Sequence, residues 1–502
     1  MNPRLKQRLI ALGGALLAVG LGWLAATGSY TLPALAGVVA LAAILVRVTR
    51  LSAEVILLGL LLIGYIVGNR GFAQLLPVPW LPLFPAEWGL AAGLAWLVIQ
   101  AAPRQTLPWR RDALNRAVLL WLAAGTARVV VDVPHYGIMA LRDYAMIYYA
   151  AFFFLAQHYA ADRRSRTFLV GCVALAAIVL LPVYYLFSEF PLFFFTNLAV
   201  QGVPLIYLKG DLAATFLAAG SIIVFHAAQG SMRWWSWPLA TAMFLAVAAS
   251  DSRASLVGAA VAMLWLLLTR RWTYPAVQGG VAAAVLLGMA VLAFSGEAPS
   301  VEARLHGLAE RVTSIADFGG TRVYDSEGTL DKGDNNRFRM VWWWTVMNET
   351  WQQGPVFGLG FGYDLAKSFV HAYDPAMGDD FTARSPHSIV MSVIGRMGAI
   401  GLVAFIVLGA AIAHKTWRVL RSRTSDPFGC GLWCAVWVIL TSACFGVVLE
   451  GPMGAVVFWT FLGLANGMTA EAPAQVPDPA DHQPSDAGRQ EGEPAATAAV
   501  VN

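Results

Sequence analysis

The stretch HSIVMSVIGRMGAIGLVAFIVLGAAIA, from His387 to Ala413, is almost wholly apolar and decides the fold class of this chain. About 20 such residues in a helix cross the roughly 30 Å of hydrocarbon in a bilayer. Backbone polar groups find no water in that layer, so they must pair within the segment, as they do in an α-helix. The stretch therefore predicts a membrane-spanning helix.

Further apolar blocks occupy most of the remaining chain. Of the 502 residues, 58% are hydrophobic and 13% are charged, whereas a soluble protein carries about 25% charged residues. Besides 387–413, the apolar blocks cover residues 9–26, 33–46, 52–68, 87–102, 113–131, 142–160, 167–187, 211–229, 234–250, 254–269, 275–294, 430–448 and 452–469. They predict an all-α, polytopic transmembrane helical bundle of about 12–14 spans, whose first block is a retained span and not a cleaved signal peptide.

The order of these blocks divides the chain into four regions. Residues 1–294 form an N-terminal transmembrane bundle, and residues 387–469 form the C-terminal spans. Between them lies one large non-membrane loop, residues 295–386. Residues 470–502 are rich in Ala, Pro, Asp, Glu and Gln, and they predict a disordered tail because they cannot bury enough apolar surface to fold.

Lysine and arginine residues gather in alternate loops. The dense clusters are Arg47 and Arg50; Arg104, Arg110, Arg111 and Arg116; Arg163, Arg164 and Arg166; Arg233; Arg270 and Arg271; and Lys415, Arg418, Arg421 and Arg423. The short loops between them hold only Arg70, Arg128, Arg142, Lys209 and Arg253. Because cytoplasmic loops carry the excess of basic residues, we predict that both termini are cytoplasmic and that residues 295–386 lie outside.

The large outside loop has a pattern of its own. Residues Glu302–Ile315 separate apolar from basic positions at helical spacing, which predicts an amphipathic helix at the membrane surface. Gly319–Asn336 predicts a loop, and Phe338–Trp351 predicts a second helix. Its tryptophans favour the bilayer interface; they are Trp342, Trp343, Trp344 and Trp351. The glycines of the turn Gly354–Gly362 indicate that backbone approaches another group closely, but they are weak evidence for a phosphate loop.

The sequence favours no metal site or cofactor. The four cysteines lie in or beside apolar blocks and are expected to be small core residues, not ligands or disulfide partners; they are Cys172, Cys430, Cys434 and Cys444. The stretch Asp331–Asn336 lacks the ligand spacing of a calcium loop. A metal-dependent reaction using Asp374, Asp379 and Asp380 is a weaker alternative, since their spacing fits a solvated loop. No pattern indicates binding of nucleic acid.

Several ionisable residues lie at the predicted outer ends of spans, where a charge is costly without a partner or a task. They are Arg128, Arg142, Lys209, Arg253, Arg384 and His387. Each one alone can reach the lipid headgroups or pair locally, as Arg253 can with Asp251. Ser385 can also cap a helix that has Pro386 at its first position. Together, however, these cations form a site for a lipid diphosphate, and His387 beside them can accept a proton from a hydroxyl near neutral pH.

The region from Arg337 to Gly401 resembles the signature of the O-antigen ligase and O-antigen polymerase superfamily. The family pattern is an arginine, an aromatic-rich helix, Pro-x-x-Gly-x-Gly, a histidine followed by a small polar residue, and Gly-x-x-Gly. Here these elements read Arg337 or Arg339, Trp342–Trp344, Pro355-Val-Phe-Gly358-Leu-Gly360, His387-Ser388 and Gly398-Ala-Ile-Gly401. Ser250-Asp-Ser-Arg253 is similar to the Ser-Arg motif on an earlier span of the family.

This resemblance implies a glycosyltransferase of the bacterial inner membrane that acts on the periplasmic face without a metal or cofactor. The donor would be a glycan on undecaprenyl pyrophosphate, and the acceptor of an O-antigen ligase would be lipid A-core. Arg253 matches the family arginine that binds donor phosphate, and His387 matches the histidine that activates the acceptor. Arg337 or Arg339 matches the loop arginine. Further candidates to bind the pyrophosphate or the glycan are Arg128, Arg142, Lys209 and Arg384.

Two features depart from the family pattern. Lys209 stands where members often have an arginine, and its ammonium lacks the two-pronged geometry of a guanidinium. The predicted number of spans exceeds the usual twelve or so. The acceptor also stays open, so the chain could be a ligase for lipid A-core, a polymerase of O-antigen or exopolysaccharide, or a protein O-oligosaccharyltransferase. A polysaccharide or lipid transporter is the alternative from another class, although it predicts charges near the middle of the bilayer.

Overall fold

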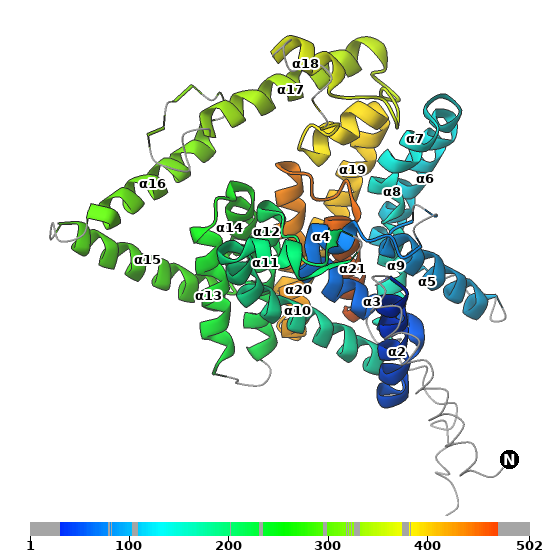
Figure 1. Cartoon of the computed structure of the whole chain (residues 1–502), viewed down its shortest axis with the longest axis horizontal. Coiled ribbons are helices and arrows are strands. Elements are labelled where there is room, and N and C mark those ends of the chain that lie inside the picture. Colours follow the sequence, from blue (N-terminus) through cyan, green and yellow to red (C-terminus); the bar gives the residue numbers. More distant parts are fainter. Residues whose placement is uncertain are drawn as a thin grey trace, which may run out of the picture. The chain divides into compact units, whose positions relative to one another are not determined.

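The computed structural model describes residues 31–78, 81, 83–102, 109–200, 202–229, 234–294, 299–317, 319, 321–322, 324–325, 332–373, 381 and 383–469. Within these residues the named strands form one two-stranded antiparallel hairpin, β1 (Ala199–Val200) and β2 (Val203–Pro204), and most of the remaining chain is helical (Figure 1). The following predictions lie outside the described residues: the span 9–26, the tail 470–502, the loop residues Arg104 and Arg233, and Asp331, Asp374, Asp379 and Asp380.

Every other predicted apolar block overlaps a helix. The helices are α2 (Thr31–Thr49), α3 (Ala53–Ile63), the π-helix η1 (Gly64–Gly68), α4 (Asn69–Ala73), α5 (Pro85–Ala101), α6 (Ala113–Tyr136), α7 (Ile138–Asp143), α8 (Ala145–Tyr148), α9 (Ala151–Tyr159), α10 (Arg163–Glu189), α11 (Pro191–Thr196), α12 (Gly210–Gln229), α13 (Ser236–Ala249), α14 (Arg253–Leu268), α15 (Thr273–Phe294), α16 (Pro299–Ala316), α17 (Lys332–Gln353), α18 (Lys367–Tyr373), α19 (Ile389–Arg421), α20 (Pro427–Cys444) and α21 (Pro452–Met468).

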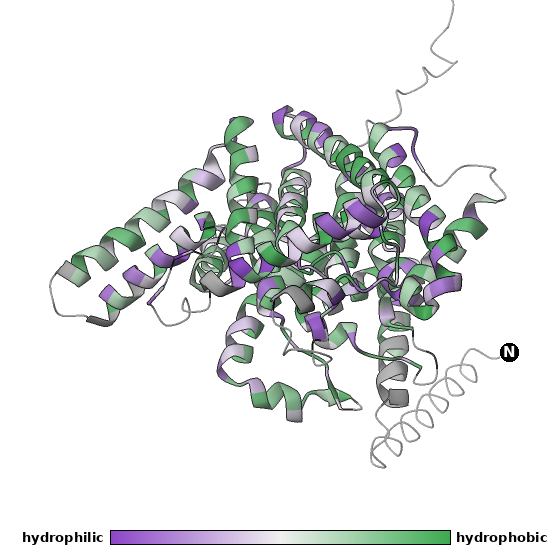
Figure 2. Ribbon diagram, turned by 90° about the horizontal axis from the view of Figure 1, so that it is seen from above, coloured by the Kyte–Doolittle hydropathy of each residue, from purple (hydrophilic) through white to green (hydrophobic). Residues whose placement is uncertain are grey.

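The length and hydropathy of these helices confirm an all-α, polytopic membrane fold. Among the described residues, eight helical stretches are long and apolar enough to cross a bilayer, and α13, α14 and α21 are shorter apolar helices. Figure 2 shows hydrophobic residues along most of the helices. Helix α12 lies at the centre of the packing, since it contacts α10, α13, α14 and α20. The N-terminal ends of α12 and α14 are thereby held side by side, with the connection from α20 to α21 close by.

Side-chain caps fix where several spans begin. The carboxylates of Asp112, Asp162 and Asp426 accept the backbone N–H groups of Asn115, Ser165 and Gly429 at 2.7, 2.8 and 2.9 Å. These aspartates precede α6, α10 and α20. Such a cap pairs an N–H group that the first turn of a helix leaves without an intrahelical partner.

Hydrogen bonds also join helix ends that the loop charges assign to one side. Asn466 near the end of α21 donates to Asp112 at 3.1 Å and to Gln157 of α9 at 2.6 Å. Lys415 near the end of α19 pairs with the same Asp112 at 3.4 Å. These ends are all predicted to be cytoplasmic, so the packing agrees with the alternation of the loop charges.

The two predicted helices of the large loop are present as α16 and α17. Helix α17 begins at Lys332, so the expectation that the loop continues to Asn336 was wrong. The tryptophans of α17 also fall into two groups, one buried and one exposed. Trp342 is buried in a small core with Phe369, where their rings stack at 4.7 Å, whereas Trp344 and Trp351 are 67% and 77% exposed. Helix α18 therefore covers Trp342, which is not available for contact with lipid headgroups, and the interfacial location of the helix stays a prediction.

Helix α19 is broken at Gly398, whose φ of 61° is outside the helical range. The glycine-rich turn that follows α17 packs against this break. The N–H of Leu359 donates to the carbonyl of Gly395 at 2.7 Å, and the N–H of Ala399 donates to the carbonyl of Pro355 at 2.9 Å. The predicted close approach of the glycines is thus to the chain's own helix.

Candidate active site

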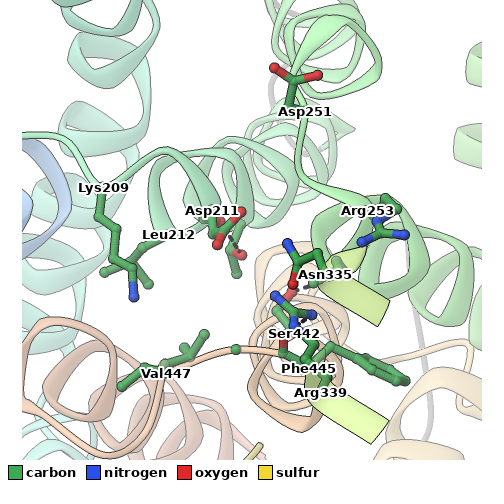
Figure 3. Close-up of a pocket in the computed structure, with 14 residues that line it drawn as sticks. Lys209, Asp211, Leu212, Asp251, Arg253, Asn335, Arg339, Ser442, Phe445 and Val447 are labelled. Atoms are coloured by element: carbon green, nitrogen blue, oxygen red, sulfur yellow. Dashed lines mark hydrogen bonds between the residues drawn. The ribbon is translucent and has the colours of Figure 1, made fainter. Parts of the chain in front are cut away.

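A cavity of about 290 Å³ lies where the N-terminal ends of α12, α14 and α17 meet the segment after α20. Its basic lining consists of Lys209, Arg253 and Arg339 (Figure 3). Asp211 of α12 lies between Lys209 and Arg253 in that view, and Asp251 lies above them. Three cations that converge on one small space suit an anion with more than one charge.

Backbone carbonyl groups hold two of these guanidinium groups. Arg253, the first residue of α14, donates from Nη1 to the carbonyl of Ser314 in α16 at 3.2 Å. Arg339 of α17 donates from Nη1 to the carbonyl of Phe445 at 2.9 Å. Each guanidinium carries five N–H donors, so further donors are available on both side chains.

The alternative in which Arg253 pairs with Asp251 is not what the structure shows. Asp251 instead accepts from Arg311 of α16 at 3.1 Å, and Arg311 also donates to the carbonyl of Ser250 at 2.7 Å. Helix α16 is thereby fastened to the turn before α14. That arrangement leaves the guanidinium of Arg253 directed at the cavity and at the end of α16.

Arg339, and not Arg337, is the loop arginine that reaches the cavity. The Arg339 side chain lines it, while Arg337 is exposed and does not. Residues two apart lie on opposite sides of a helix, so only one of this pair can face the cavity. Burial lowers the pKa of Arg339, and nearby Asp211 opposes that shift.

His387 lies in the turn before α19 with a left-handed φ of 53°. The helix begins later than predicted: Ser388 is its N-cap and accepts the N–H of Met391, so Ser385 and Pro386 do not fill the cap and first positions. The positive φ reverses the chain at His387, which delays the start of the helix. The imidazole then packs edge-on against the ring of Trp342 at 5.7 Å.

His387 lines a second cavity, of about 230 Å³. The other lining residues are Arg142, Asp143, Met146, Ala383, Arg384, Ser385, Arg396, Val447 and Glu450. Val447 also lines the first cavity, so this one side chain lies between the two spaces.

The charges of the first cavity also affect the pKa of His387. Burial, followed by the charges of Arg339 and Lys209, lowers the pKa of His387 to about 4, and Asp211 opposes this shift. The imidazole is therefore neutral at pH 7 and free to accept a proton. Lys209 has a lowered pKa as well, because burial disfavours its charge more than Asp211 favours it.

Arg128 and Arg384 mainly hold the glycine-rich turn in place. Arg128 pairs at 3.0 Å with Asp132, which accepts the N–H of Phe361 at 2.7 Å. Arg384 donates to the carbonyl of Gly362 at 2.7 Å. Arg384 also borders the second cavity, whereas Arg128 lines neither cavity. Arg142 is exposed at the second cavity.

The same turn offers little to a phosphate. The N–H groups of Leu359 and Phe361 are taken by the Gly395 carbonyl and by Asp132. The N–H of Gly362 donates to Asp143 at 3.0 Å. These glycines are needed for backbone packing, which explains why the phosphate-loop interpretation had weak support.

Sequence reasoning missed several residues of the site. Arg396 is buried within α19 and pairs with Asp143 at 2.5 Å. Glu450 faces the second cavity, and Asp211 faces the first. A signal was available for two of them, because Arg396 interrupts an apolar block and Glu450 stands alone between two such blocks.

Among the described residues, no three His, Cys, Asp or Glu side chains are grouped so that they could hold a metal ion. The four cysteines are free; Cys172, Cys430 and Cys434 are buried, and Cys444 is partly buried.

Comparison with known proteins adds one match. Residues 238–406 match the family described as O-antigen ligase, a stretch that contains Arg253, Arg339 and His387. Lys209 and Glu450 lie outside the matched residues. No curated protein matches the chain. This match to residues 238–406 of a multi-pass membrane protein supports the O-antigen ligase superfamily, which in general implies glycosyltransferase- or ligase-like activity.

Proposed function

We propose that the protein transfers a glycan from undecaprenyl pyrophosphate to an acceptor hydroxyl, most simply as an O-antigen ligase whose acceptor is lipid A-core. One observation carries this proposal: Lys209, Arg253 and Arg339 line one cavity, and His387 stands next to it across Val447. A diphosphate needs several cations, and a hydroxyl nucleophile needs a neutral base. The first cavity offers the cations, and the second offers the neutral imidazole of His387.

In this mechanism the three cations hold the diphosphate in the first cavity. The acceptor oxygen attacks the anomeric carbon from the second cavity, and a new glycosidic C–O bond forms with inversion. The C–O bond to the diphosphate breaks, and its electron pair stays on the diphosphate. His387 takes the hydroxyl proton. The arginines stabilise the charge that grows on the leaving group, so the reaction needs no metal ion or other cofactor.

The proposal includes a location. The distribution of basic residues among the loops supports a site on the periplasmic face of the bacterial inner membrane, with both termini in the cytoplasm and the loop 295–386 outside. The polyprenyl chain of the donor would stay in the bilayer while its diphosphate reaches Lys209 at the start of α12.

The identity of the acceptor distinguishes this proposal from its alternatives within the family. A polymerase would use a second lipid-linked glycan, and a protein O-oligosaccharyltransferase would use a serine or threonine of a protein. A transporter would perform no transfer at all. The partners that we propose are the lipid-linked donor, a glycan acceptor and the bilayer.

The test is a transfer assay with purified protein in liposomes. It offers a lipid-pyrophosphate glycan together with lipid A-core, a second glycan lipid or a protein acceptor, with and without a chelator. We expect transfer to lipid A-core with the chelator present, and loss of transfer in Arg253→Ala and His387→Ala. Near-wild-type transfer by either variant, or transport of the glycan lipid without a new bond, would overturn the proposal.

A further inference from the structure

The segment from Phe445 to Glu450 connects α20 to α21 and forms a wall of both cavities. Its first carbonyl, that of Phe445, accepts Arg339 of the first cavity at 2.9 Å. Val447 in its middle lines both cavities, and Glu450 at its end lines the second. The segment thus contacts the diphosphate side at one end and the His387 side at the other.

Glu450 holds the helix that follows His387. Its Oε1 accepts the hydroxyl of Ser392, in the first turn of α19, at 2.6 Å. The backbone N–H of His387 donates to Ser385 Oγ at 3.3 Å, and Ser385 lines the second cavity together with Glu450. The carboxylate therefore anchors the first turn of α19 directly after the turn that carries His387.

The turn needs such restraint because its backbone is strained. A non-glycine residue with a left-handed φ, here 53° at His387, costs roughly 1–2 kcal/mol, and the surrounding structure must enforce it. From the other side, Trp343 Nε1 donates to the carbonyl of Pro386 at 2.7 Å. Glu450 and Trp343 hold the turn from two different elements.

We propose that Glu450 is a positioning residue that fixes the imidazole of His387 toward the acceptor cavity by holding the first turn of α19 through Ser392. The catalytic part of this inference rests on the proposed function. Glu450 acts here by accepting the hydroxyl hydrogen bond of Ser392 and takes no proton from the substrate. The side chain of glutamine has nearly the same shape, and serine hydroxyls can either donate to it or accept from it, so glutamine can keep the turn in place.

Two substitutions test this role. Glu450→Ala removes the hydrogen bond to Ser392, and a catalytic group misplaced by about 1 Å loses roughly 100-fold in rate. We expect kcat for transfer to fall by about that factor, while the KM for the donor stays unchanged. Glu450→Gln should lose less than about tenfold, because neutral hydrogen bonds replace charged ones. A rate for Glu450→Gln as low as that of Glu450→Ala, or a wild-type rate for Glu450→Ala, would refute the positioning role.

A second measurement does not depend on the reaction. Diethyl pyrocarbonate modifies neutral imidazoles, and mass spectrometry of the peptide that carries His387 reports its rate of modification in the full-length protein. We expect faster modification in Glu450→Ala and the wild-type rate in Glu450→Gln. Equal rates in all three proteins would overturn the inference. Altered modification together with an active His387→Ala variant would leave the positioning intact and refute the proposed function. Glu189→Ala, at an exposed carboxylate that ends α10, is the control and should match the wild type in both measurements.

Discussion

Gly358 and Gly398 pack backbone against backbone, and both have left-handed φ angles, 74° and 61°. A Cβ atom added to Gly358 would lie 2.6 Å from the backbone nitrogen of Gly398 and 2.5 Å from the carbonyl carbon of Arg396. Neither neighbour is a flexible side chain that could turn away. The turn after α17 and the break in α19 therefore form one unit, and the turn carrying His387 sits at its edge.

Gly358→Ala should destabilise the protein strongly, because it adds a clash with backbone to a φ that disfavours side chains by roughly 1–2 kcal/mol. We expect a lower Tm in detergent and loss of transfer through misfolding of the loop. Gly409→Ala is the matched control, since Gly409 lies in the same α19 with no atom within 4 Å of an added Cβ. It should leave the Tm equal or slightly higher. Equal Tm values for the two variants would contradict the packing described here.

Arg339→Ala and Arg337→Ala form a second matched pair. Arg339 lines the first cavity, whereas Arg337 is exposed on another face of α17. Removing one donor to the charge that develops on a leaving group costs roughly 100- to 1,000-fold in rate. We expect that loss for Arg339→Ala in the liposome assay and little change for Arg337→Ala. The reverse order of rates would assign the loop arginine to Arg337.

The rate of transfer should stay constant from pH 7 down to roughly pH 5 and fall as His387 becomes protonated. Burial and the charges of Arg339 and Lys209 lower the pKa of His387 from 6.5 to about 4. The dependence of kcat/KM on pH reports this pKa in the free enzyme. An acidic limb near pH 6.5 would show that His387 is solvated instead.

The same pKa shift of His387 also affects the stability of the folded protein. The unfolded chain binds a proton at His387 near pH 6.5, whereas the folded chain resists it until about pH 4. The stability from this residue is therefore complete above pH 6.5 and is lost as the pH falls toward 4. His387→Asn removes this dependence while keeping a residue that tolerates a left-handed φ. Its Tm should vary less with pH across that window than the Tm of the wild type.

Asp211→Asn should strengthen donor binding, in contrast to substitutions of the neighbouring cations. Asp211 lines the first cavity and lies close enough to Lys209 and Arg339 to oppose their pKa shifts. Its negative charge repels a diphosphate, so its removal should lower the donor KM by roughly fivefold to tenfold. Glu302→Gln, an exposed carboxylate of α16, controls for net charge. A raised KM for Asp211→Asn would show that Asp211 supports the cations more than it repels the donor.

The apolar blocks could be predicted because a bilayer demands long apolar helices, and each block within the described residues became a helix. The start of α19 could not be predicted. A serine and a proline are good signals for the beginning of a helix, but the left-handed backbone of His387 is enforced by contacts with Trp343 and Glu450, which come from distant parts of the chain.

Sequence motifs predicted most of the cations that line the two cavities, but they did not predict which carboxylates would lie beside them. Arg253 and His387 stand in recognisable motifs, whereas Asp211 and Glu450 gain their places only when α12 and the segment after α20 come together. The choice between Arg337 and Arg339 depended on how α17 rotates about its axis. That rotation is set by the burial of Trp342 against Phe369, a contact that helical spacing alone does not reveal.

Val447 lines both cavities, so the two spaces lie next to each other. In the proposed reaction, the attacking oxygen and the departing diphosphate would occupy different chambers that meet at the anomeric carbon. Water could reach that carbon by the acceptor's route, past Arg142 at the exposed edge of the second chamber. How fully an acceptor fills that chamber would then decide how much activated glycan is lost to hydrolysis.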